Sequence, residues 1–149
     1  MVEVTNEQLL EQARIAWSRA YAKYSKYKVG AAILTKDGKI ILGCNIENAS
    51  YGGTICAERS AICSAISQGY RDFEAIAVVV DAGHVASPCG ICRQFLVEFG
   101  NYKVILGTVK TNDVNVTSTY DLLPYAFTPK NLEEFDHVNG HNTTHIESA

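Results

Sequence analysis

Three cysteines in two segments of the chain have the residue type and spacing of a metal site. Cys89 and Cys92 are three residues apart and follow Pro88 at the start of a helical pattern, so both thiols lie on a first helical turn. Cys56 also comes directly before a helical pattern. The positive end of a helix dipole favours thiolate over thiol, and thiolates suit the tetrahedral coordination of zinc. The sequence therefore predicts a zinc site formed by Cys56, Cys89 and Cys92.

Glu58 favours a catalytic interpretation of this site. Structural zinc sites have four protein ligands, whereas catalytic sites leave one position to water, and here the cysteines supply three. Glu58 lies two residues after Cys56, where a carboxylate can exchange protons with such a water without binding the metal. A glutamate in a first turn can also simply stabilise the helix dipole. Because thiolates adjoin it, we expect Glu58 to be the catalytic proton shuttle.

Two other kinds of protein could use the same residues. In a non-catalytic zinc module, His84 in the loop before the cysteine pair would supply the fourth ligand. In a thiol redox protein, Cys89 and Cys92 would be the reactive pair, and Cys56 and Glu58 would have no role.

Hydrophobic patterns indicate the elements that must position these residues. Apolar residues recur at helical spacing in three segments, short β-branched runs separate them, and Asp37-Gly38 joins two of the runs as a tight hairpin. We expect Cys44 and Cys63 to lie in the core. The expected helices are 6–22, 57–67 and 89–99, the expected strands are 29–34, 39–42, 75–80, 104–106 and 114–117, and 120–125 is expected to form one helical turn.

This order of elements predicts an α/β fold, a three-layer α/β/α sandwich with a mixed five-stranded sheet. The hairpin makes the first half of the sheet antiparallel, and the alternation of strands and helices predicts largely parallel pairing in the second half. We expect one domain over residues 1–127. The polar residues 128–149 have few apolar anchors and are expected to form a mobile tail or a strap across a neighbouring molecule.

Three motifs in the same order resemble the small cytidine deaminases whose zinc ligands are all cysteines. They are Asn45-Ile46-Glu47-Asn48-Ala49-Ser50-Tyr51, Cys56-Ala57-Glu58-Arg59-Ser60-Ala61 and Ser87-Pro88-Cys89-Gly90-Ile91-Cys92-Arg93-Gln94. The resemblance implies a homotetramer that holds one zinc ion per chain. It also implies hydrolysis of cytidine and 2′-deoxycytidine to the uridine nucleosides with release of ammonia, a reaction of pyrimidine salvage. A blasticidin-type deaminase is a related alternative, which the intact first motif disfavours.

The resemblance also implies roles at the metal. Glu58 would take a proton from water, pass it to N3 of the base and then protonate the leaving amine. Arg59 is expected to hydrogen-bond to a ligand sulfur, which would balance the negative charge of three thiolates on one zinc ion. The zinc ligands are Cys56, Cys89 and Cys92.

Nucleoside contacts are implied for five further residues. Asn45 and Glu47 correspond to a pair that binds the ribose 3′-hydroxyl, and an amide and a carboxylate suit a sugar alcohol. Tyr27 falls where the family usually has a phenylalanine that lines the base pocket, and Ala57 is expected to contact the substrate. Phe127 matches an aromatic residue that enters the pocket of a neighbouring subunit.

The composition limits the possible classes of protein. With 149 residues, 47% of them hydrophobic and 19% charged, the chain suits one domain with a sizeable core. A net charge of −3 lacks the basic excess that nucleic-acid binding needs. The longest apolar run, 75–80, is far shorter than the roughly 18 residues of a membrane span. Five cysteines and an acidic start without a signal pattern favour a reducing compartment. We therefore expect a cytoplasmic protein that binds neither nucleic acid nor membrane.

Overall fold

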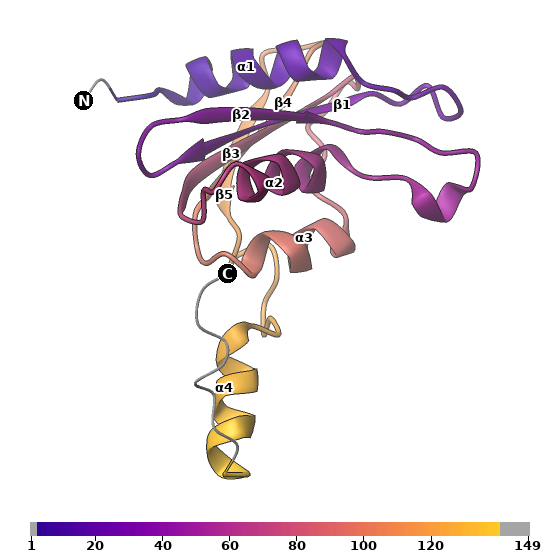
Figure 1. Cartoon of the computed structure of the whole chain (residues 1–149). Coiled ribbons are helices and arrows are strands. Elements are labelled where there is room, and N and C mark those ends of the chain that lie inside the picture. Colours follow the sequence, from indigo (N-terminus) through magenta and orange to yellow (C-terminus); the bar gives the residue numbers. More distant parts are fainter. Residues whose placement is uncertain (1–2, 141–149) are drawn as a thin grey trace.

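A mixed five-stranded sheet lies between two helical layers in the computed structural model, which describes residues 3–140 (Figure 1). Helix α1 (Asn6–Ser18) covers one face, and α2 (Ala57–Ser67) and α3 (Gly90–Val97) cover the other. This arrangement confirms the predicted sandwich. In the order in which they lie in the sheet, the strands are β2 (Ile40–Cys44), β1 (Val29–Thr35), β3 (Phe73–Val80), β4 (Lys103–Thr108) and β5 (Val114–Ser118).

Strand pairing is antiparallel at both edges and parallel at one central pair. Strand β1 runs antiparallel to β2 and β3, with Ala32 opposite Leu42 and Ala77. Strands β3 and β4 are parallel, with Ala77 opposite Ile105, because α3 carries the chain back across the sheet. Strand β5 is antiparallel to β4, so the expectation of a largely parallel second half is wrong at this edge. A short loop joins β4 to β5, and a loop of this kind permits reversal but no crossover.

The sheet is buried on both faces, which explains the continuous apolar run in β3. Successive side chains of a strand point to opposite faces. Ile76 and Val78 of β3 pack with α2 and α3, whereas Ala77 and Val79 pack with α1. On the α1 side the helix contributes Leu9, Leu10 and Ala13.

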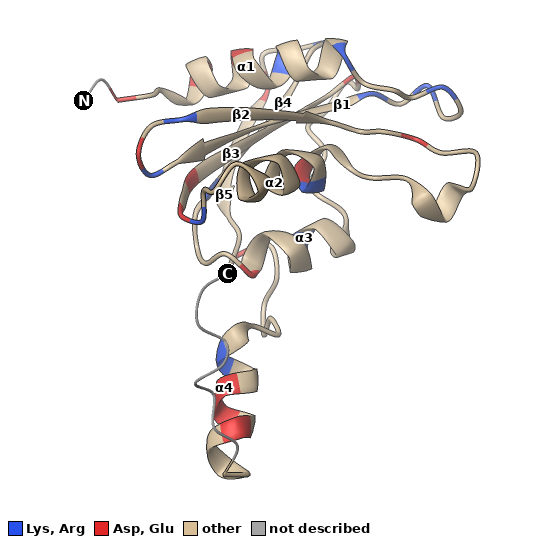
Figure 2. Ribbon diagram, viewed as in Figure 1, with Lys and Arg blue, Asp and Glu red and all other residues tan. Residues whose placement is uncertain are grey.

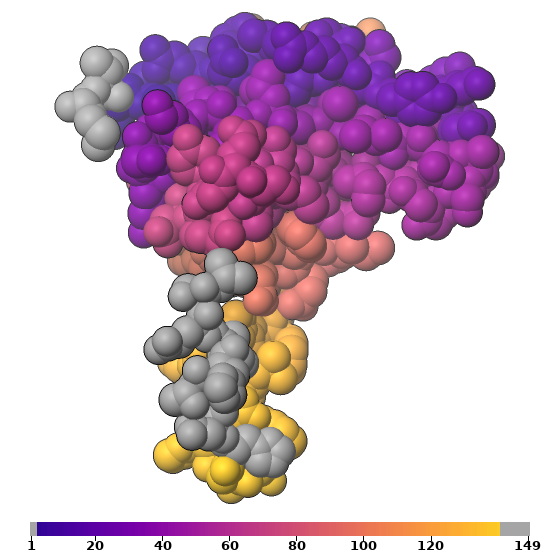
Figure 3. Space-filling model, viewed as in Figure 1, coloured from indigo at the N-terminus to yellow at the C-terminus, as the bar shows by residue number. Residues whose placement is uncertain are grey.

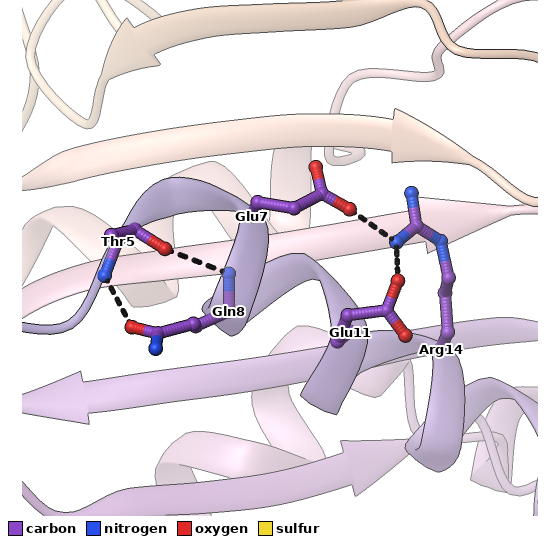
Figure 4. Close-up of polar contacts among 5 residues, drawn as sticks. All are labelled: Thr5, Glu7, Gln8, Glu11 and Arg14. Atoms are coloured by element: carbon purple, nitrogen blue, oxygen red, sulfur yellow. Dashed lines mark hydrogen bonds and ion pairs between the residues drawn. The ribbon is translucent and has the colours of Figure 1, made fainter.

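Helix α1 begins with a capping box formed by Thr5 and Gln8 (Figure 4). The Thr5 hydroxyl accepts from the Gln8 amide at 3.1 Å, and the Gln8 side chain accepts from the Thr5 amide at 2.9 Å. Further along the helix, Arg14 pairs with Glu7 at 2.9 Å and also with Glu11. These contacts fix the start and the outer face of the helix.

Two predicted helical segments differ from the structure by more than two residues. Helix α1 ends at Ser18, short of the expected residue 22, because the Tyr21 amide donates to the Asn45 carbonyl at 3.0 Å and leaves the helix. Residues 120–125 form successive turns without a helix, and Tyr125 has a φ of 55°. The hairpin of β1 and β2 closes as predicted, with Gly38 at a φ of 88°.

A glycine allows α2 to lie directly on β2. A Cβ atom added at Gly43 would lie 2.2 Å from the Ala61 amide nitrogen and 2.6 Å from the Ala57 carbonyl oxygen. Both are backbone atoms of α2, so the helix would have to move. The position of the first turn of α2, which carries Glu58, therefore depends on this close approach.

The C-terminal segment forms a helix that projects from the sandwich (Figures 1 and 3). Helix α4 (Pro129–Val138) begins with a capping box of Thr128 and Asn131. The mobile tail or strap expected for 128–149 did not include this helix, because its start signal was overlooked. None of the residues of α4 is buried, and most of its charges are acidic (Figure 2). Residues 141–149 of the predicted tail lie outside the described residues. Within 3–140, no helix is long and apolar enough to cross a bilayer.

Candidate metal centre and active site

The starts of α2 and α3 bring the three predicted zinc ligands together. Cys56 is the residue before α2, Cys89 is the residue before α3, and Cys92 lies in the first turn of α3. Their sulfur atoms all lie within 4.8 Å of one another. The two helices lie side by side on the same face of the sheet, and this packing makes the cluster from segments more than thirty residues apart.

The cluster fits a zinc ion. Tetrahedral zinc with Zn–S bonds of about 2.3 Å places its sulfur ligands roughly 3.8 Å apart. The observed sulfur separations need at most a small adjustment to reach that value. Thiolates at helix starts match the preference of zinc for soft ligands. No other group of three potential ligands occurs among residues 3–140, so the structure offers three protein ligands and an open fourth position.

Local charges prepare the cluster to bind a cation. The neighbouring Cys92, as the largest cause, lowers the pKa of Cys56 to about 5, and the Arg59 guanidinium contributes in the same direction. Arg59 Nη2 lies 3.6 Å from Cys56 Sγ. The neighbouring Cys56, together with burial, raises the pKa of Cys92. The cluster therefore favours a thiolate at Cys56, and metal binding displaces the remaining thiol protons.

Glu58 lies beside the cluster in a nearly dry position. The residue is only 6% exposed, and its Oε2 accepts a hydrogen bond from Cys92 Sγ at 3.4 Å. Burial, as the largest cause, raises the pKa of the Glu58 carboxyl. A carboxyl with a raised pKa can both accept and release a proton near neutral pH.

A cavity of about 370 Å³ opens onto the cluster. Its wall comes from the loop before β1, the loop after β2, the start of α2 and the loop before α3. The expected catalytic group, two zinc ligands and four of the expected nucleoside contacts therefore share one space. The predicted site residues that line the cavity are Tyr27, Asn45, Glu47, Cys56, Ala57, Glu58 and Cys89.

Asn45 and Glu47 also hold the loop that forms the opposite wall. Asn45 donates from Nδ2 to the Tyr27 carbonyl at 2.8 Å, and its Oδ1 accepts from the Val29 amide at 2.9 Å. Glu47 Oε1 accepts from the amides of Tyr24 and Ser25, both at 2.9 Å. These side chains fix the path of the loop that carries Tyr27.

Three further residues named in the sequence analysis lie outside both the cysteine cluster and the cavity. The Phe127 side chain is 58% exposed and does not line the cavity, and its carbonyl accepts from Gln94 Nε2 at 2.8 Å. His84 does not join the cluster, because its ring faces solvent with Nδ1 4.0 Å from Asp113. Cys63 is exposed on α2, so its expected place in the core is wrong.

The sequence analysis missed two residues that shape the site. Ser25 lines the cavity and donates a hydrogen bond from its hydroxyl to Glu47 Oε2. Arg93 donates from Nε to the Pro88 carbonyl and from Nη1 to the Leu122 carbonyl, each at 2.8 Å, and so holds the loop before Cys89. Arg93 stands within the third motif and Ser25 stands two residues before Tyr27. These positions were the only signal, because neither residue has a chemical type or spacing that suggests a site.

The sandwich, the three-cysteine cluster and the buried carboxyl together define a zinc-dependent hydrolase of the deaminase class. Residues 3–108 match the sequence model of the cytidine and deoxycytidylate deaminase zinc-binding region. The cytidine deaminase of Sporosarcina psychrophila is 47% identical, over 85% of this chain and 93% of that protein. The crystal structure of cytidine deaminase from Burkholderia pseudomallei has a TM-score of 0.81 and 51% identity, covering 83% of this chain and 100% of that one. The chain belongs to the cytidine deaminase family, and the predicted resemblance is confirmed.

The blasticidin-type alternative has a more distant relative. The blasticidin-S deaminase of Bacillus cereus is 36% identical, over 83% of this chain and 94% of that protein. This identity is lower than that of the cytidine deaminases described above. The comparison therefore favours the cytidine deaminases.

Proposed function

We propose that this chain hydrolyses cytidine and 2′-deoxycytidine to uridine and 2′-deoxyuridine, releasing ammonia, as a step of pyrimidine salvage. The observation that carries the proposal is that one cavity is lined by the buried Glu58 and by Cys56 and Cys89 of the three-cysteine cluster. Hydrolysis needs both parts, since the cysteines hold the metal and Glu58 transfers protons.

Glu58 performs the proton transfers in this proposal. Zinc held by the three cysteines supplies a Lewis acid that lowers the pKa of water to near neutrality. The Glu58 carboxylate takes a proton from the attacking water and delivers it to N3, while the water oxygen forms a bond to C4 of the base. Glu58 then carries the second proton to the amine at C4, the C4–N bond breaks and ammonia leaves. The raised pKa of Glu58 suits a group that both takes and gives protons.

The charge of the cavity favours a nucleoside over a nucleotide. Glu47 and Glu58 line it, and no lysine or arginine is among its lining residues. A 5′-phosphate would bring two further negative charges towards these carboxylates without a lysine or arginine in the lining to offset them. The neutral sugar and base are therefore the better fit.

The other residues expected at the site also have roles in the proposed reaction. Asn45 and Glu47 bind the 3′-hydroxyl, Tyr27 packs against the base, and Ala57 at the start of α2 lies against the ring. Arg59 balances the charge of the zinc thiolates through its contact with Cys56.

We further propose that the chain works as a homotetramer in the cytoplasm. Phe127 lies outside its own cavity and is largely exposed, which suits a ring that enters the pocket of another subunit. Residues 1–127 form the catalytic domain in this proposal, and 128–149 form an appended segment. Neither nucleic acid nor a membrane is expected as a partner.

Turnover and metal content test the proposed reaction together. We expect purified protein to hold about one zinc ion per chain and to deaminate cytidine and 2′-deoxycytidine, with cytidine 5′-monophosphate a much poorer substrate. The loss of cytosine absorbance with each compound and elemental analysis of the same sample are the measurements. Protein that holds zinc and turns over none of these compounds would instead be a structural zinc module.

A further inference from the structure

We propose that Ser25 is a positioning residue for nucleoside binding, which orients the Glu47 carboxylate towards the sugar. Ser25 belongs to the loop between α1 and β1, and its hydroxyl donates to Glu47 Oε2. The inference rests on the proposed function, because it concerns how the same cavity holds the sugar.

A hydrogen bond that Ser25 Oγ accepts from the Tyr27 amide determines the direction of the Ser25 hydroxyl. The Tyr27 amide donates to Ser25 Oγ at 3.0 Å, so an oxygen lone pair is already used there. The hydroxyl proton is then directed to Glu47, whose carboxylate can only accept. Lys26 between them has a φ of 63°, and this turn brings the Tyr27 amide back to the serine. The serine is therefore a fixed donor.

The hydrogen bonds around Glu47 leave a defined position for a ligand. A carboxylate has about four acceptor positions. The amides of Tyr24 and Ser25 use two of them on Oε1, and the Ser25 hydroxyl uses one on Oε2. One position on Oε2 remains, and Glu47 lines the cavity. The Ser25 hydrogen bond also keeps Glu47 ionised, since it is the largest cause of the lowered pKa of that carboxyl.

Replacing the hydroxyl separates this role from a general role in folding. In Ser25→Ala, Glu47 keeps its two amide donors but Oε2 can rotate away, so we expect Kd for uridine and KM for cytidine to rise about tenfold. The kcat value and the zinc content should stay within about twofold, because Ser25 touches neither Glu58 nor a cysteine. Ser25→Thr keeps the hydroxyl and should restore both constants. Ser18→Ala is the matched control, because Ser18 is also an exposed serine with a hydrogen-bonded hydroxyl, and lies outside the cavity.

A ligand that lacks the 2′- and 3′-hydroxyls of the sugar tests the route through Glu47. For 2′,3′-dideoxycytidine, measured as a competitor of cytidine, we expect Ser25→Ala to weaken binding less than about threefold. An equal loss for cytidine and the dideoxy compound overturns the inference, as does unchanged binding in Ser25→Ala or failure of Ser25→Thr to restore it. Wild-type protein that binds no uridine by calorimetry overturns the proposed function as well. A defect confined to the variants leaves that function standing.

Discussion

At the residue scale, the site depends on one carboxyl kept out of water. Glu58 is buried beside the three sulfurs, and its pKa is raised chiefly by that burial. An exposed glutamate would remain ionised through the neutral range and would return a proton poorly. The same burial keeps bulk water from the Glu58 carboxyl, which strengthens its charge interactions. Position and acidity of Glu58 therefore have one physical cause.

Glu58→Gln tests this assignment. The amide keeps the size and most of the hydrogen bonding of the carboxyl but cannot carry a proton, so kcat for cytidine should fall by roughly 10² to 10⁴. Zinc content should remain at the wild-type value, because the three ligand sulfurs are unchanged. Steady-state kinetics and elemental analysis of the same preparation are the measurements. Turnover within a few fold of wild type would remove Glu58 from the proton transfers.

The sequence predicted the zinc ligands but could not predict how the loops hold the substrate side. Cys56, Cys89 and Glu58 have unusual chemical types at helix starts, and a helix start can be read from local residues alone. The hydrogen bonds of Glu47 to Ser25 and its neighbour depend on the path of a loop more than twenty residues away. No local pattern encodes that path. For the same reason Phe127 could not be placed relative to the cavity.

At the element scale, the position of α2 is set by its contact with β2. The helix carries Glu58 on its first turn and Cys56 directly before it, and it approaches β2 so closely that only glycine fits at residue 43. Helix α3 brings the other two sulfurs from the neighbouring position on the same face. Any displacement of α2 thus moves Cys56 and Glu58 relative to the two cysteines at the start of α3.

Gly43→Ala should loosen the metal site without touching a ligand. The added methyl group would meet backbone atoms of α2, and overpacking of this kind costs about 1 to 3 kcal/mol, or roughly 3 to 10 °C in Tm. We expect zinc to be lost to a chelator faster than from wild type. Gly83→Ala is the control, because a Cβ there meets nothing within 4 Å. Equal Tm and equal zinc retention in the two variants would show that the close approach is unimportant.

Elements whose signals are local were predicted better than those that depend on distant partners. Helix α2 has the predicted bounds, and Asp37-Gly38 closes its hairpin, because periodicity and turn residues act within a few positions. The direction of β5 was predicted wrongly because the alternation of strands and helices was extended to β4 and β5, although the short loop between these strands permits only a reversal. Helix α4 was missed because polar composition was given more weight than the start signal at Thr128 and Pro129.

At the scale of the whole molecule, no residue of the segment between β5 and α4 lines the cavity. The Phe127 ring is largely exposed, and Gln94 of α3 holds its backbone carbonyl. Tyr125 in the same segment is fully exposed and has a left-handed backbone conformation. An exposed aromatic segment outside its own cavity is the arrangement expected when copies of one chain complete each other's sites.

Mixing two defective variants tests whether Phe127 acts in a second subunit. Phe127→Ala should lower kcat/KM for cytidine by roughly five- to a hundredfold, the effect of losing one aromatic ring against a base. Chains of Phe127→Ala have an intact Glu58, and chains of Glu58→Gln have an intact ring, so subunits exchanged between them should form some complete pockets. The mixture should then exceed the summed activities of its components. The control replaces the second partner with Glu58→Gln/Phe127→Ala, in which no chain supplies the ring. Equal activity in both mixtures would place the action of Phe127 within its own chain.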